Sequence, residues 1–169
     1  MNHTYICSYT RTPIGAFQGT LSSTPATSLG ASVIKSVVEK SSFKKTNVNE
    51  VIMGNVLSAN LGQAPARQSC LEGGLSNNIE CMTINKVCGS GMKSIMLADQ
   101  SIHTGNSDIV IAGGMENMSL APYYIENSRK GTIFGHNELI DSIIKDGLWD
   151  PYNNIAMGTF SGGYMAGNR

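Results

Sequence analysis

Apolar residues recur at helical spacing along residues 25–40 of the chain. One broad face collects Leu29, Val33, Ile34, Val37 and Val38, and polar residues mainly occupy the other face. Thr24 precedes this run, and a threonine hydroxyl can cap the free N–H groups of a first helical turn. Pro25 loses no hydrogen bond at the first helical position. The pattern predicts a helix from Pro25 to about Lys40 whose apolar face packs on a sheet.

The next part of the chain alternates between short apolar segments and helical ones. The predicted strands are residues 51–57, 82–87 and 109–112, and the predicted helices between them are residues 64–73 and 90–104. Such alternation is typical of right-handed crossovers in a largely parallel, buried sheet. Residues 5–9 predict one more strand. The fold class is therefore α/β, with a mostly parallel sheet flanked by helices.

The pattern loosens after Gly114 into Pro, Asn, Ser and Gly. Residues 115–135 are too many for an ordinary connection, so they predict a functional excursion or an oligomer contact. Residues 137–145 predict a short helix. The three expected parts are an α/β region over residues 1–114, a partial loop domain or oligomer contact region over 115–159, and an atypical, frayed tail over 160–169.

Composition and charge exclude several classes of protein. The chain has 169 residues, of which 41% are hydrophobic and 14% charged, so it is neither disordered nor a coiled coil. Twelve basic residues balance twelve acidic ones, which is unlike a nucleic-acid-binding protein and favours small or carrier-bound substrates. We find no membrane-spanning run and no signal peptide, and we expect a cytoplasmic protein.

The cysteines give little sign of a metal site. Cys7, Cys70, Cys81 and Cys88 form no CxxC pair and have no metal-ligand spacing with the three histidines. We therefore expect reduced thiols, no metal and no permanently bound cofactor.

Cys88 has the most informative surroundings, because it lies between the end of a predicted strand and the start of a predicted helix. The first-turn N–H groups and the helix dipole favour a thiolate there, and the thiolate is the nucleophilic form. Gly89 and Gly91 give a substrate access, as small neighbours do in a nucleophile elbow. The local pattern also fits a second interpretation, in which Cys88 is a small, inert apolar residue at a tight turn.

A nucleophilic thiol normally has a base beside it. His103 is the closest histidine in the sequence, but fifteen helical residues place it about 22 Å from Cys88. His3 and His136 remain candidates, in a predicted terminal strand and an irregular loop. No base is evident from the sequence.

Five segments together resemble a known family. They are Arg11–Gly15, Gly62–Gln68, Asn85–Gly91, Ala112–Ser119 and Asp146–Leu148. In this order they resemble the N-terminal half of a biosynthetic thiolase, an acetyl-CoA C-acetyltransferase or acetoacetyl-CoA thiolase, over residues 3 to about 159.

The resemblance implies a fold of two similar halves, each a five-stranded sheet flanked by helices, of which this chain would supply the first and part of a loop domain. It implies reversible condensation of two acetyl-CoA molecules to acetoacetyl-CoA. Cys88 would carry the acyl group as a thioester, and its backbone N–H would be an oxyanion donor. Met157 would lie near coenzyme A. The family form would be a homo-oligomer, without nucleic acid or membrane as partner.

The chain also departs from the family. The family's Asn, activating His and second Cys lie in the second half, and Ala64 and Ala156 replace an Asn and a His of many relatives. A truncated or frameshifted product and a genuinely short chain would both explain these departures. We expect little condensation activity from this chain alone. The alternatives are a catalytically dead fragment that pairs with another thiolase subunit, and a related condensing enzyme such as a ketoacyl synthase or a longer-chain 3-ketoacyl-CoA thiolase.

Overall fold

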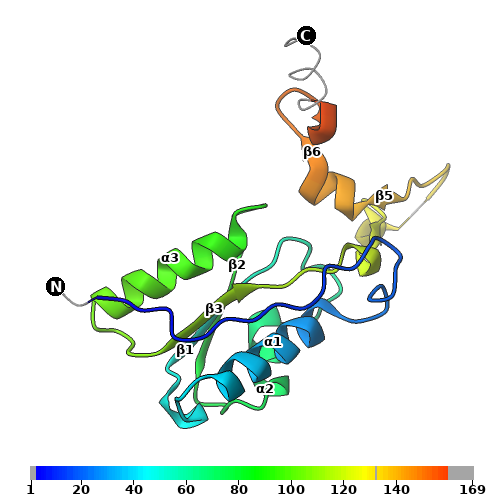
Figure 1. Ribbon diagram of the computed structural model, residues 1–169. Helices are drawn as coiled ribbons and strands as arrows, with labels where there is room; N and C mark the ends of the chain where they lie inside the picture. Colours follow the sequence, from blue (N-terminus) through cyan, green and yellow to red (C-terminus); the bar gives the residue numbers. More distant parts are fainter. Residues whose placement is uncertain (1–2, 132, 160–169) are drawn as a thin grey trace, which may run out of the picture. The chain divides into compact units, whose positions relative to one another are not determined.

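The computed structural model describes residues 3–131 and 133–159. Contacts divide the chain into two units, Met1–Leu120 and Ala121–Arg169. In the first unit a parallel sheet lies between two helical layers, and α1 and α2 cover one face while α3 covers the other (Figure 1). The predicted α/β fold with helices on both sides of a parallel sheet is confirmed.

The sheet of the first unit has three strands in the order β2-β1-β3. They are β1 Glu50–Gly54, β2 Glu80–Ile84 and β3 Val110–Gly114, and both pairings are parallel. At the carboxyl edge Gly54 lies opposite both Ile84 and Gly114. All five residues of β1 are buried, as expected of a central strand in a parallel sheet.

The strand predicted for residues 5–9 is wrong. This segment belongs to no strand in the described structure, and Tyr5, Ile6 and Tyr9 have at least three quarters of their surface exposed. Both sides of β1 are already paired with β2 and β3, so the alternating pattern of residues 5–9 finds no partner there. The sheet within the described ranges therefore has fewer strands than the five that the resemblance implied.

The first helix, α1 Ala26–Lys40, is confirmed, but its start and its buried face differ from the prediction. Pro25 precedes the first helical residue and no side chain caps the helix, so Thr24 does not have the predicted role. Small residues dominate the buried face, because α2 Pro65–Glu72 packs closely against it. A Cβ added to Gly30 would lie 2.7 Å from the hydroxyl oxygen of Ser69.

The remaining predicted elements of the first unit are close to the observed ones. The strands and helices predicted between residues 51 and 112 correspond to β1, α2, β2, α3 Ser90–His103 and β3. A single apolar cluster connects them, and Ile34, Val51 and Met53 are among its fully buried members. Short 3₁₀ turns occur at Lys45–Asn47 and Met118–Leu120.

The second unit consists of short elements. Two antiparallel ladders pair β4 Tyr123–Tyr124 with β5 Ile140–Asp141, and β6 Trp149–Asp150 with β7 Ile155–Ala156. The other elements are η3 Ser128–Lys130 and the π-helix η4 Ile143–Leu148.

The helix predicted for residues 137–145 is wrong in position. The Asp141 carboxylate accepts the Ile143 N–H at 2.8 Å, and this local bond starts the helical turn after Asp141. The tail predicted for residues 160–169 lies outside the described residues.

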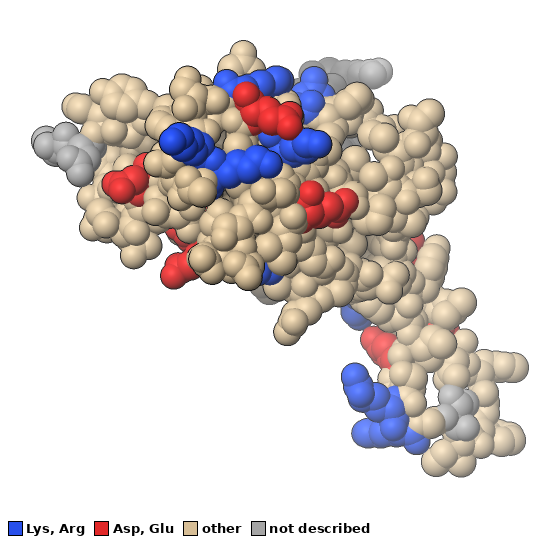
Figure 2. All heavy atoms as spheres, turned by 90° about the horizontal axis from the view of Figure 1, so that it is seen from below, with Lys and Arg blue, Asp and Glu red and all other residues tan. Residues whose placement is uncertain are grey.

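The surface carries both signs of charge. Figure 2 shows basic side chains interspersed with acidic ones on the face that α1 and α2 cover, consistent with the balanced composition. None of the helices in the described ranges is long and apolar enough to cross a membrane.

Candidate active site

Cys88 lies in the loop that leaves β2 at Ile84 and enters α3 at Ser90. The loop starts at the carboxyl edge of the sheet, where parallel α/β folds commonly bind ligands. The Cys88 side chain is exposed. The burial that is common for an inert cysteine is therefore not observed at Cys88.

The backbone immediately before Cys88 is strained. Val87 has a φ of 48°, which is an outlier for a β-branched residue. Ser90 holds this turn, because its hydroxyl accepts the Lys86 N–H at 2.8 Å and donates to the Val87 carbonyl at 2.6 Å. The Asn85 side-chain oxygen accepts the Val87 N–H at 2.9 Å. Cys88 therefore follows a tight turn between β2 and α3 that is fixed by hydrogen bonds, as in a nucleophile elbow.

Glycines bring the start of α3 directly onto the strand ends. A Cβ on Gly54 would lie 2.6 Å from the carbonyl carbon of Ser90 and 2.8 Å from the Gly91 nitrogen. A Cβ on Gly114 would lie 3.4 Å from the Gly91 Cα. The hydroxyl of Ser94 also donates to the Gly113 carbonyl at 2.8 Å. The Cys88 loop is therefore positioned by the ends of β1 and β3.

Glu116 joins these two strand ends, and sequence reasoning did not single it out. Its carboxylate accepts the Val56 N–H at 2.8 Å, the Leu57 N–H at 3.2 Å and an Asn55 amide hydrogen at 2.8 Å. Burial raises the pKa of Glu116, and these hydrogen bonds oppose the shift. The signal in the sequence was an acidic residue two positions after the Gly-Gly that ends a strand.

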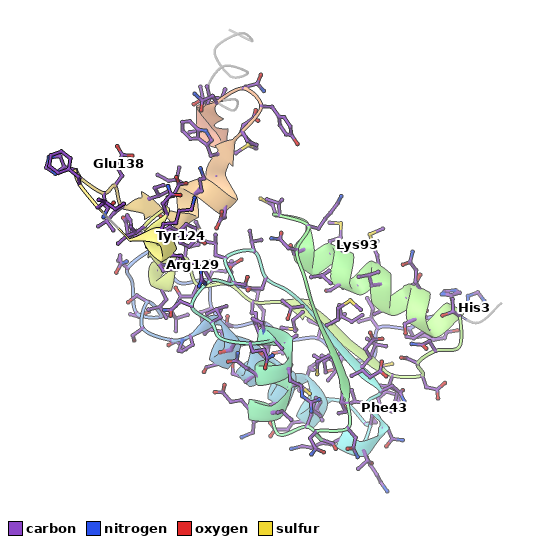
Figure 3. All side chains as sticks on the ribbon, turned by 180° about the vertical axis from the view of Figure 1, so that it is seen from behind. His3, Phe43, Lys93, Tyr124, Arg129 and Glu138 are labelled. Carbon is purple, nitrogen blue, oxygen red and sulfur yellow. The ribbon has the colours of Figure 1, made fainter. Side chains whose placement is uncertain are left out.

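The structure places two candidate bases at the far end of α3. His103 is its last residue, with Nδ1 3.2 Å from the Asp99 carboxylate and 3.4 Å from the Thr4 hydroxyl. Figure 3 shows His3 beside the same end of the helix. Neither histidine lies beside Cys88. This confirms that His103 is not the base for Cys88, and it excludes His3 from the same role. His136 is exposed in the second unit.

The other cysteines differ sharply from Cys88. Cys70 is fully buried, and burial together with the neighbouring Cys81 thiol raises its pKa to about 12. Cys7 is exposed on the segment that forms no strand. Across the described residues no three His, Cys, Asp or Glu side chains are grouped as a metal site would require. Met157 follows β7 in the second unit and is half exposed.

A polar hollow of about 420 Å³ opens at the amino ends of the strands, lined by residues such as Asn49, Glu80 and Ser107. Its lining contains neither cysteine nor histidine. Beside it the buried carboxylate of Glu50 accepts hydrogen bonds from the hydroxyls of Ser101 at 3.0 Å and Ser107 at 3.4 Å. Cys88 is thus at the opposite edge of the sheet.

Comparison with known proteins gives consistent results. Residues 4–166 match the family described as Thiolase, N-terminal domain. The chain is 54% identical over 149 residues to Acetyl-CoA acetyltransferase 2 of Arabidopsis thaliana, covering 88% of this chain and 37% of that protein. It is 53% identical to Acetyl-CoA acetyltransferase of Schizosaccharomyces pombe, covering 91% and 39%.

A solved structure agrees with these relatives. The crystal structure of Acat5 thiolase from Ascaris suum in complex with coenzyme A superposes with a TM-score of 0.90 at 40% identity, covering 96% of this chain and 42% of that one. The chain thus spans about two fifths of the length of the proteins that it matches.

Proposed function

Because the chain belongs to the thiolase family, whose N-terminal domain it carries, we propose that it serves the reversible condensation of two acetyl-CoA molecules to acetoacetyl-CoA, with Cys88 as the acyl carrier. The exposed thiol of Cys88 on a strained turn at the start of α3 is the observation that carries this proposal. The names of the relatives support acetyl-CoA as the substrate.

The proposed first step transfers an acetyl group to the protein. The Cys88 thiolate attacks the carbonyl carbon of acetyl-CoA, a bond forms between that carbon and Sγ, and the bond to the coenzyme A sulfur breaks. Coenzyme A then leaves and takes up a proton. The backbone N–H of Cys88 stabilises the negative oxygen of the intermediate. Gly89 and Gly91 leave room for the thioester.

The proposed second step forms the carbon–carbon bond. A second acetyl-CoA loses a proton next to its carbonyl, and the resulting carbanion attacks the Cys88 thioester and releases the thiol. His3 and His103 lie away from Cys88, so we propose that the base and the second oxyanion site belong to the part of a thiolase that this chain does not span. Met157 is proposed to contact coenzyme A.

A second candidate function is pairing with another thiolase chain or segment. Met92, Ile95 and Met96 form an exposed apolar stripe on α3, and each has at least half of its surface exposed. Ile133 and Phe134, in the proposed contact region of residues 115–159, are almost fully exposed. Apolar surface of this kind is typical of an interface. Co-purification with a full-length thiolase would support this function.

The direct test is transfer of acetyl from acetyl-CoA to the folded chain, mapped by mass spectrometry. Trypsin should release Cys88 in the peptide Val87–Lys93, since Lys86 and Lys93 flank it. We expect acetyl on this peptide, its loss in Cys88→Ser, and its retention in Cys7→Ser, which removes another exposed cysteine. Acetylation of Cys7 at the same rate as Cys88 would contradict the proposal. We expect little acetoacetyl-CoA from this chain alone.

A further inference from the structure

We propose that Glu116 is a positioning residue for Cys88, because it ties together the two strand ends against which the Cys88 loop packs. The inference rests on the proposed function only in taking Cys88 as the nucleophile. Glu116 is not suggested to touch substrate.

The first step of the argument is the hydrogen-bond cluster around Glu116. This residue follows β3, yet its carboxylate accepts hydrogen bonds from three consecutive residues after β1, namely Asn55, Val56 and Leu57. The Met115 N–H adds a bond to the Gly54 carbonyl at 2.9 Å. The Glu116 side chain therefore extends the backbone pairing of β1 and β3 beyond the ends of the two strands.

The second step is the orientation of Asn55, which is 2% exposed. Its amide nitrogen donates both to the Met115 carbonyl at 3.1 Å and to Glu116, while its buried Oδ1 has no hydrogen-bond partner in the described structure. An unpaired buried acceptor is costly. Asn55 thus adopts the orientation in which its amide donates to both the Met115 carbonyl and the Glu116 carboxylate.

The third step leads from this cluster to Cys88. Gly54 and Gly114 lie just before the joined segments, and both have backbone contacts with the start of α3 at Ser90 and Gly91. Ser90 in turn bonds Lys86 and Val87 and so holds the left-handed turn before Cys88. Separation of the two strand ends would disturb Ser90 first, and then the backbone that presents the thiol.

Glu116→Gln is the informative substitution, because it keeps the size and removes one acceptor. Its amide nitrogen would face either the backbone N–H groups of Val56 and Leu57 or the amide of Asn55, since all of these are donors. Glu50→Gln is the matched control. Glu50 is a buried carboxylate at the other end of the same strand, also held by hydrogen bonds.

The experiment measures alkylation of the full chain by iodoacetamide, which needs no thiolase chemistry. The Val87–Lys93 peptide reports Cys88, and the exposed Cys7 in the same sample is the internal reference. A loosened helix start should slow alkylation of Cys88 by about 3- to 10-fold in Glu116→Gln and leave Cys7 unchanged. Glu50→Gln should lower the melting temperature and leave the ratio of the Cys88 and Cys7 rates within about two-fold of the unsubstituted chain.

Rates are compared at a temperature at which circular dichroism shows every variant folded. Glu116→Asp keeps both acceptor oxygens but has a shorter side chain. Its Cys88 alkylation rate should lie between those of Glu116→Gln and the unsubstituted chain. If Glu116→Gln does not fold, Glu116→Asp takes its place in the comparison. An unchanged Cys88 rate, or an equal change in Glu50→Gln, would overturn the proposal. If acetyl-CoA fails to acetylate Cys88 while the alkylation difference persists, the proposed function is wrong and the positioning role stands.

Discussion

Each of the two units is stabilised internally by a different kind of contact. In the described structure every buried apolar side chain lies between Ala26 and Met115, within the first unit. The second unit has short two-residue ladders and polar bonds, such as Tyr124 Oη to the Asp146 carboxylate at 2.5 Å and Asn153 Nδ2 to the Asp150 carboxylate at 2.6 Å. The first unit is therefore stabilised by apolar packing, whereas the second unit relies on local bonds that are individually worth about 1 kcal/mol.

The largest expected effect comes from truncating an apolar side chain in each unit. Met53 is 1% exposed in β1, and Met53→Ala should lower the free energy of unfolding by about 2–5 kcal/mol. Leu139 is 67% exposed, and Leu139→Ala should change the free energy of unfolding by less than about 0.5 kcal/mol. Urea denaturation of both variants measures the difference. Equal losses would show that the second unit buries Leu139 in solution.

A smaller effect is expected from pH acting on the first unit. Burial raises the pKa of Glu116 above its ordinary value of 4.5, so the folded state holds this proton more tightly than the unfolded state. The resulting stability is fully present below pH 4.5 and is lost as the pH rises through the raised pKa. The stability advantage of the unsubstituted chain over Glu116→Gln should therefore shrink as the pH increases over this range. Melting temperatures of both proteins across the range provide the test, and an advantage that grows with pH would contradict it.

The smallest effect is expected in the second unit, from the pair of Tyr124 and Asp146. The hydrogen bond to the Asp146 carboxylate raises the pKa of Tyr124 above 10.0, because it favours the neutral phenol. Its contribution to stability is present below that ordinary value and is lost as the pH rises through the raised pKa. The absorbance of tyrosinate, compared with Tyr124→Phe, isolates this group among six tyrosines. Asp146→Asn should bring the titration back toward pH 10.0, and an unchanged curve would show that the pair does not form.

The sequence predicted those features of the fold that depend on local periodicity. The helix α3 and the strand β1 follow from apolar spacing and from flanking turns, and Cys88 was found because it lies between two such elements. The strand predicted for residues 5–9 failed because a strand also needs a partner, which periodicity does not supply. Glu116 was missed for a similar reason, since its hydrogen-bond donors lie about sixty residues earlier in the chain.

The join between the exits of β1 and β3 has a consequence for the order of folding. Cys88 leaves the ribosome before Gly114 and Glu116, which complete its surroundings. A nascent chain or an intermediate that lacks β3 would contain α3 and the thiol without the strand end that packs against them. Because contacts so distant along the chain form late, the Cys88 loop becomes organised only once the first unit is nearly finished. A chain arrested earlier would therefore present Cys88 without the strand end that fixes its surroundings.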